Sequence, residues 1–230
     1  MTLPDIQTLY DVTEATWPSA SATSQSGWII KDGAGGGKRV CATIQIEPSA
    51  DIALAEDAML SFNQDRLFQI RTGENALDVA LESRGYDLID RVVFLAAPLT
   101  SLCKTHSTQN EEAPTEAMKS IWANGGIGPE RLNVMARANA PKTYAHIDDR
   151  AVAYAAIHNG ICMAHAVEVS KNHRRQGLGK SIMHQIAGWA ETQGAQFMAV
   201  ITVAENTAAR TLYQNLGMSE VGHYHYRIKR

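Results

Sequence analysis

The 230-residue sequence predicts a mixed α/β protein built from two units. Short β-rich runs alternate with amphipathic helical stretches, a pattern that favours helices packed on a mixed sheet. A polar stretch between Pro98 and Pro114 divides the chain, and its composition predicts little burial of apolar surface. We therefore expect one unit at 1–98, a linker at 99–112 and a second unit of similar size at 113–230.

The composition bears on partners and compartment. A formal net charge of -3 gives no reason to expect nucleic acid or an anionic membrane as the main partner. No apolar run approaches the ~20 residues that span a bilayer, and the N-terminus lacks the regions of a signal peptide. Cys41, Cys103 and Cys162 form no CxxC pair and are expected to be reduced thiols. These observations predict a cytoplasmic protein.

The second unit begins with two expected helices and three expected strands. Glu116–Trp122 and Pro129–Ala138 are predicted to be short helices, the second with proline in its first turn. Asn159-Gly160 is a strong hairpin signal between two of the strands. The strands are expected at 143–147, 151–157 and 161–169.

A long amphipathic helix is expected to begin near Gly177, followed by a buried strand at 197–203. Asn206 is a good N-cap and Gly217 a good C′ residue for the next helix. Two final strands are expected at Met218–Val221 and Tyr224–Ile228.

The first unit repeats this ending in a weaker form. A strand is expected at 67–70 and a helix at 77–84, with Gly85 matching Gly217 before a strand at 86–96. We interpret this as a divergent internal repeat.

The glycine cluster at 35–37 precedes Lys38 but is not a Walker A loop. Asp32 occupies the place of the first glycine, and Arg39 that of Ser or Thr. We expect a flexible hairpin turn here, between strands at 28–30 and 40–46.

The chemistry of the chain concentrates at 174–180, where a strand ends and the long helix opens. Gly177 and Gly179 allow close approach of a ligand to the backbone. The first N–H groups of a helix have no internal partners and lie at the positive end of its dipole. With Arg174, Arg175 and Lys180 nearby, these features predict a pyrophosphate-binding loop. A dinucleotide fingerprint is excluded because it would need a third glycine at position 182.

Residues 174–179 resemble the R/Q-x-x-G-x-G/A signature of the GNAT acetyltransferase superfamily. The segment from Asn206 to Met218 is similar to the superfamily's N-x-x-A-x-x-L-Y-x-x-x-G-F, with Met218 in place of Phe. The stretch 223–227 resembles a subset of bacterial members with a degenerate acetyltransferase-like N-terminal half. The resemblance implies the GNAT acyl-CoA acyltransferase fold, here a tandem with a degenerate first copy.

The resemblance also implies acetyl-CoA as co-substrate and direct attack of a primary amine on the thioester. Backbone groups of Val167 and Val169 would pair with the pantetheine arm, and the Val167 N–H would face the acetyl oxygen. Asn206 would contact the CoA arm, and Tyr213 would protonate the departing thiolate; alternatively, Tyr213 is a core aromatic at helical spacing. The pyrophosphate would bind at Arg174, Arg175, Gln176, Gly177, Leu178, Gly179 and Lys180.

The general base stays open between His165, Glu168 and a water chain. Strand alternation predicts that His165 shares a face with Val167 and Val169, and that Glu168 lies on the opposite one. The acceptor-side candidates are Tyr224, His223 and His225. Two histidines without a third ligand are weak evidence for a metal, so no metal is expected.

The expected acceptor is a small-molecule amine or, less favoured, a peptide. Trp122 and Asp148-Asp149 could attract a cationic amine, although acids in turns are usually solvated. The first unit lacks the loop motif and has Leu81 in the place of Tyr213, so we expect it to bind no CoA. It would complete the sheet, wall the acceptor pocket or form a homodimer surface. The alternatives are a non-catalytic acetyl-CoA sensor and an enzyme for a longer acyl chain, which the small Ala164 and Ala166 leave open.

Overall fold

A computed structural model describes residues 2–102, 104–106 and 109–230. Over these residues the chain forms one large mixed sheet and one small antiparallel sheet, which confirms the predicted mixed α/β class. The large sheet has the spatial order β4 (Arg66–Arg71), β11 (Ser219–Lys229), β5 (Asp87–Pro98), β10 (Phe197–Val203), β9 (Ile161–Val169), β8 (Ala151–His158), β7 (Lys142–Ile147) and β6 (Asn110–Glu111). Its strand pairs are antiparallel except β9 with β10.

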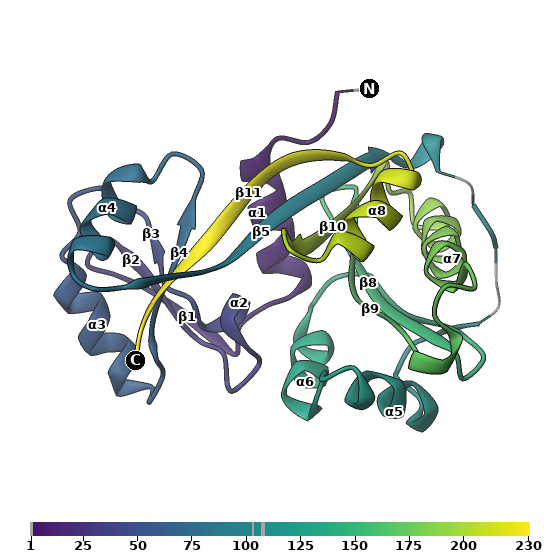
Figure 1. Cartoon of the computed structure of the whole chain (residues 1–230), viewed down its shortest axis with the longest axis horizontal. Coiled ribbons are helices and arrows are strands. Elements are labelled where there is room, and N and C mark those ends of the chain that lie inside the picture. The colour runs from purple at the N-terminus through teal and green to yellow at the C-terminus, as the bar shows by residue number, and fades with distance from the viewer. Residues whose placement is uncertain (1, 103, 107–108) are drawn as a thin grey trace.

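Strand β11 lies between β4 and β5, so the last strand completes the sheet of the first half. β5 and β11 run side by side across the molecule (Figure 1). The prediction of two separate final strands is wrong: β11 is continuous, with register irregularities at 220–222 and 224–226. The long partner β5 holds it extended. Gly222 lies within this strand, where Ile6 of α1 (Ile6–Thr16) packs against it: a Cβ there would be 2.7 Å from that side chain.

The first half also contains the small sheet of β1 (Ser21–Gln25), β2 (Trp28–Asp32) and β3 (Ile44–Gln45), with helices α2 (Lys38–Cys41), α3 (Ile52–Ser61) and α4 (Asn75–Ser83). β2 and β3 pair antiparallel as expected. The predicted simple hairpin is wrong, however, because α2 stands between them. This helical turn buries Val40 in a cluster with Trp17 and Trp122, a tertiary contact that outweighs local β propensity.

The second half places helices on both faces of the sheet. α7 (Leu178–Thr192) and α8 (Thr207–Asn215) pack on one face, and α5 (Glu116–Asn124) and α6 (Pro129–Arg137) on the other, where α1 also lies. Pro129 occupies the first turn of α6, as predicted. The cluster under α7 and α8 is mainly aliphatic, whereas the cluster under α5 and α6 also contains the rings of Trp122, Tyr144 and Tyr154. The two faces of the sheet therefore carry separate hydrophobic cores.

The segment expected to be a linker takes part in the core. Leu99 and Leu102 are buried in the cluster under α7, so the expectation of little apolar burial is wrong at these positions. Cys41 is half-buried and Cys162 is buried, and neither forms a disulfide within the described residues. Cys103 lies outside the described residues, as do positions 107 and 108 of the predicted linker.

Candidate active site

The site begins where the parallel pair β9–β10 separates. The two strands pair over four positions only, from Ile161 opposite Phe197 to Ala164 opposite Val200. Beyond Ala164, β9 continues to Val169 without a β10 partner among the strands that the structure describes. Unpaired backbone groups on that edge can accept a ligand that behaves as an added strand.

A β-bulge at Ala166 shapes this edge. Ala166 has φ 52°, and the register with β8 shifts between Val152 and Tyr154. The extra residue interrupts the alternation of faces. Val167 therefore packs toward α7, whereas His165 stacks beside Trp17 on the other face. The prediction that His165 shares a face with Val167 and Val169 is wrong for this reason.

Trp122 of α5 fixes the bulge. Its indole is fully buried, and its Nε1–H donates to the Ala166 carbonyl at 2.8 Å. The suggestion that Trp122 attracts an amine is therefore wrong, because its ring does not reach the surface. The acidic turn is not part of the site, because neither Asp148 nor Asp149 lines a cavity described below. The Asp148 carboxylate accepts instead from Arg150 at 2.7 Å and from Gln109 at 3.2 Å. The sequence carries no signal that couples Trp122 to Ala166.

A cavity of about 590 Å³, which we call the loop cavity, opens on the α7 and α8 face. It collects all the residues singled out for cofactor binding except Gln176. Its lining consists of Val167, Glu168, Val169, His173, Arg174, Arg175, Gly177, Leu178, Gly179, Lys180, Asn206, Ala208, Ala209, Leu212 and Tyr213.

The N-terminus of α7 faces this cavity without a side-chain cap. Gly177 is the N-cap in the left-handed conformation, with φ 80°, and the first turn holds no acidic residue. Ser181 N–H donates to the Gly177 carbonyl, so the three amides before it have no intrahelical acceptor. Such an end favours an anion. Glycine at position 179 is explained by helix packing. A Cβ there would lie 3.0 Å from the Leu212 side chain, so the lack of a side chain lets α8 pack closely.

The three predicted cations of the loop differ in whether they already have an ion-pair partner. Arg174 is paired with Glu168, Nη2 to Oε1 at 2.9 Å, and its Nε–H donates to the Val169 carbonyl. Arg175 and Lys180 make no ion pair within the described part of the chain and line the cavity. They supply the positive charge that an anion at the helix end would meet.

Tyr213 and Asn206 reach the loop cavity from α8. The Asn206 side chain accepts from the Ala209 N–H at 3.1 Å, so it caps α8 as predicted. Tyr213 is buried in the cluster under α7 and also lines the cavity. Burial raises the pKa of the Tyr213 phenol to about 12, so it stays protonated at neutral pH. Both alternatives for Tyr213, core aromatic and cavity group, describe its position.

A second cavity of about 260 Å³, the arginine cavity, lies on the opposite face. Sequence reasoning did not connect its residues, which come from both halves of the chain. They are Trp17, Gly36, Gly37, Lys38, Arg39, Asp90, Val92, Ile127, Arg131, Ala166, Val203, Tyr224 and Tyr226. Ala166 lines this cavity and its neighbour Val167 lines the loop cavity, so the two cavities meet at successive residues of the bulge.

His165 does not have the contacts of a general base. The Thr16 hydroxyl donates to the Val12 carbonyl at 2.7 Å, so it accepts from His165 Nε2–H at 2.9 Å. Arg39 Nη1 then donates to the free Nδ1 at 3.4 Å. Burial and the Arg39 charge hold the pKa of His165 well below its ordinary value, which keeps the ring neutral. Both nitrogens are thus occupied.

The remaining histidine candidates lie away from both cavities. His223 is exposed, and His225 pairs with Asp78 at 2.8 Å on the α4 side. The described residues hold no cluster of three or more side chains suited to a metal. Nor does any helix in the described ranges have the length and apolar character to cross a membrane. Tyr224 alone among the acceptor-side candidates lines the arginine cavity.

Parallel strands that separate beside a bulge, next to an uncapped helix opened by glycine, form the arrangement that the GNAT resemblance implies. The chain belongs to the family described as "Probable histone acetyltransferase Rv0428c C-terminal", whose model matches residues 4–228. This confirms the GNAT resemblance and makes the protein an acyltransferase of the N-acetyltransferase class.

Relatives of the chain agree with this placement. The uncharacterized N-acetyltransferase YobR of Bacillus subtilis is 26% identical, covering 99% of this chain and 100% of its own. A GCN5-related N-acetyltransferase from Kribbella flavida superimposes with a TM-score of 0.65 at 16% identity, covering 99% and 96% of the two chains. One from Sphaerobacter thermophilus gives 0.62 at 12% identity, covering 91% and 82%. These structures confirm the expected GNAT fold.

Proposed function

We propose that the protein transfers an acetyl group from acetyl-CoA to a primary amine of a small molecule. The observation that carries this proposal is the meeting of the two cavities at Ala166 and Val167. The donor occupies the loop cavity on one face of the sheet, and the acceptor occupies the arginine cavity on the other. The thioester lies between them at the bulge.

The loop cavity holds CoA through its backbone. The pyrophosphate binds to the free amides at the start of α7, where the helix dipole and Lys180 favour negative charge. The pantetheine arm extends along the unpaired edge of β9 from Val169 to Val167, past Asn206. The Val167 N–H then faces the acetyl oxygen, where charge develops in the transition state.

The chemical step is a direct displacement. The amine nitrogen forms a bond to the acetyl carbon, and the carbon–sulfur bond breaks as the tetrahedral oxyanion collapses. Tyr213 lines the loop cavity and donates its phenolic proton to the CoA thiolate as the carbon–sulfur bond breaks. The amine proton leaves to Glu168 or to a water chain, since both His165 nitrogens are occupied.

The test is calorimetric titration of acetyl-CoA into wild type, Gly177→Glu and Gly194→Glu. Both glycines have a left-handed φ, 80° and 78°, and neither would place a Cβ within 4 Å of another atom. The two variants therefore carry equal strain and equal charge, but only Gly177 faces the loop cavity. We expect Gly177→Glu to weaken binding about 100-fold through charge repulsion, and Gly194→Glu to bind like wild type.

Turnover is then measured as release of the CoA thiol with a panel of amines. Transfer by wild type, lost in Gly177→Glu and kept in Gly194→Glu, supports the proposal. Binding without transfer to any amine identifies an acetyl-CoA sensor instead. A folded wild type that does not bind acetyl-CoA refutes both.

A further inference from the structure

The arginine cavity has an excess of positive charge. Three cations line it, Lys38, Arg39 and Arg131, against the single carboxylate of Asp90. Lys38 Nζ lies 2.6 Å from Asp90 Oδ2, so these two charges neutralise one another. Two guanidinium groups remain without a carboxylate partner among the residues that the structure describes.

Arg39 lies on the inner wall of the cavity. Its guanidinium carbon lies 5.9 Å from the Trp17 ring centroid, and its Nη1 contacts His165. Its Nε–H is buried and makes no hydrogen bond within the described ranges. The Arg39 side chain as a whole is half-buried, and a buried N–H without an acceptor is costly. The side chain is therefore arranged for a partner that comes from outside the chain.

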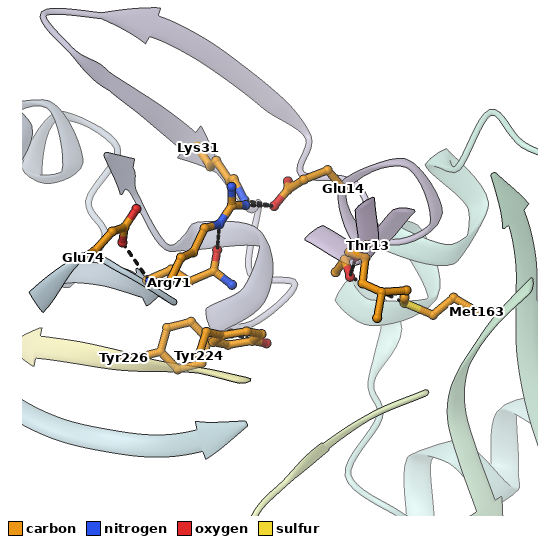
Figure 2. A network of polar contacts seen from close by, with 10 residues as sticks. Thr13, Glu14, Lys31, Arg71, Glu74, Met163, Tyr224 and Tyr226 are labelled. Carbon is orange, nitrogen blue, oxygen red and sulfur yellow. Dashed lines mark hydrogen bonds and ion pairs between the residues drawn. The ribbon is translucent and has the colours of Figure 1, made fainter. Parts of the chain in front are cut away.

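The carboxylate behind Arg39 is already engaged. Glu14 Oε1 lies 2.6 Å from Lys31 Nζ and 3.4 Å from Arg71 Nη2, and Figure 2 shows these two cations converging on it. Lys31 is almost wholly buried, and burial lowers its pKa, so its charged form depends on Glu14. Glu14 stabilises this pair of cations and leaves the Arg39 charge without an ion-pair partner.

Arg131 also lines the arginine cavity. It stands on α6, and its guanidinium lies 3.4–3.5 Å from the point where a Cβ of Gly37 would lie. The one side-chain hydrogen bond of Arg131 within the described chain is a long one, Nη1 to the Gly126 carbonyl at 3.4 Å. Arg39 and Arg131 therefore flank the same short loop, each with donors to spare.

We propose that the acceptor amine carries an oxyanion, a carboxylate or a phosphate, that binds between Arg39 and Arg131. This inference rests on the proposed function, because it takes the arginine cavity as the acceptor site. Guanidinium groups match planar oxyanions with paired hydrogen bonds. The cavity is smaller than the roughly 300–1,000 Å³ of typical drug-sized sites, which limits the acceptor to about the size of an amino acid.

The position of the bulge completes the assignment. Ala166 lies on the cavity wall, so an acceptor anchored by its oxyanion presents its amine to the thioester beside Val167. The rings of Trp17, Tyr224 and Tyr226 line the same cavity and suit an apolar body between the two ends. The acceptor class is thus a small amino acid or an aminoalkyl phosphate.

The test uses acceptors that differ only in charge. Release of the CoA thiol is measured with phenylalanine against phenylalaninamide, and with O-phosphoethanolamine against ethanolamine. We expect the anionic member of at least one pair to have a kcat/KM about 100-fold higher, through KM. The pair that shows the preference distinguishes carboxylate from phosphate.

Arg39→Gln and Arg131→Gln are expected to reduce this preference at least tenfold, without changing acetyl-CoA affinity. Arg137→Gln is the matched control, because Arg137 lies on the same helix outside the cavity and donates to the Asn133 carbonyl. Arg39→Gln removes an unpaired charge and is expected to fold. Thermal stabilisation by N-acetylphenylalanine over its amide, with CoA bound, gives a readout independent of turnover.

The outcomes separate the two proposals. Equal rates and equal stabilisation for charged and neutral members overturn the inference, while acetyl transfer and CoA binding still support the proposed function. A preference that survives in both arginine variants also overturns it. Failure of wild type to bind acetyl-CoA refutes the proposed function and the inference with it.

Discussion

The contact between Trp122 and the bulge provides the sharpest test of how the fold supports the site. In Trp122→Phe the buried indole N–H is lost, and the Ala166 carbonyl no longer has this donor. Trp28→Phe is a matched control, because Trp28 is equally buried and donates its Nε1–H to the Asp51 carbonyl at 3.0 Å, in the first half. Both variants lose the same chemical groups.

The structure sets the expected magnitude. Loss of the indole hydrogen bond costs about 0.5–1.5 kcal/mol and the cavity left by the smaller ring adds to it, so each variant loses about 2–4 kcal/mol. For a chain of this length that lowers Tm by about 4–16 °C. Only Trp122→Phe releases the bulge, and misplacement of the acetyl-binding edge lowers kcat/KM a further ten- to 100-fold, by rough estimate.

Urea unfolding and acetyl transfer, measured on both variants below their unfolding transitions, separate these effects. The expected result is similar destabilisation with a rate defect in Trp122→Phe alone. Equal rates in the two variants would show that the position of Ala166 does not depend on this hydrogen bond, and the account of the bulge would be wrong.

Three further predictions follow from buried groups. Tyr213→Phe is expected to lower kcat about 100-fold or more, with unchanged acetyl-CoA affinity. The control Tyr144→Phe changes a buried tyrosine outside both cavities and should keep the wild-type kcat; equal kcat values in the two variants would exclude the acid role. The pKa of His165 is lower in the folded state than its unfolded value of about 6.5. At pH values between these two pKa values the unfolded state binds more protons than the folded state, so the free energy of unfolding falls as the pH drops below about 6.5. This group contributes at most about 1.4 kcal/mol per pH unit, and His165→Gln should flatten urea midpoints between pH 5 and 7; an unchanged slope contradicts the assignment. Gly188→Ala places a Cβ 2.5 Å from the Thr105 carbonyl oxygen and costs about 1–3 kcal/mol, and an unchanged thermal midpoint would contradict that contact.

The parts of the site that were predictable are local in the chain. Asn206 caps its helix, Pro129 starts one, and Gly177 opens another, each because a side chain or its absence acts within a few residues. The loop cavity is lined by two short stretches of sequence, 167–180 and 206–213, whose motifs resemble those of the GNAT superfamily. Residues of this kind leave a pattern that spacing alone can detect.

The arginine cavity and the bulge were not predictable for the opposite reason. Ala166 has no intrinsic preference for a positive φ; tertiary contacts impose it, such as the bond from Trp122, 44 positions away. Arg39 meets His165 across 126 positions. A glycine-rich turn before Lys38 signals an irregular loop but not what the loop will face. Such juxtapositions depend on the order of the strands, which local patterns do not encode.

The place of β11 has a consequence for biosynthesis. Because this strand fills the gap between β4 and β5, the first half of the protein leaves the ribosome with two open strand edges that stay unpaired until residues 219–229 emerge. Exposed edges of this kind recruit other strands, so the nascent chain is open to misassociation until β11 fills the gap.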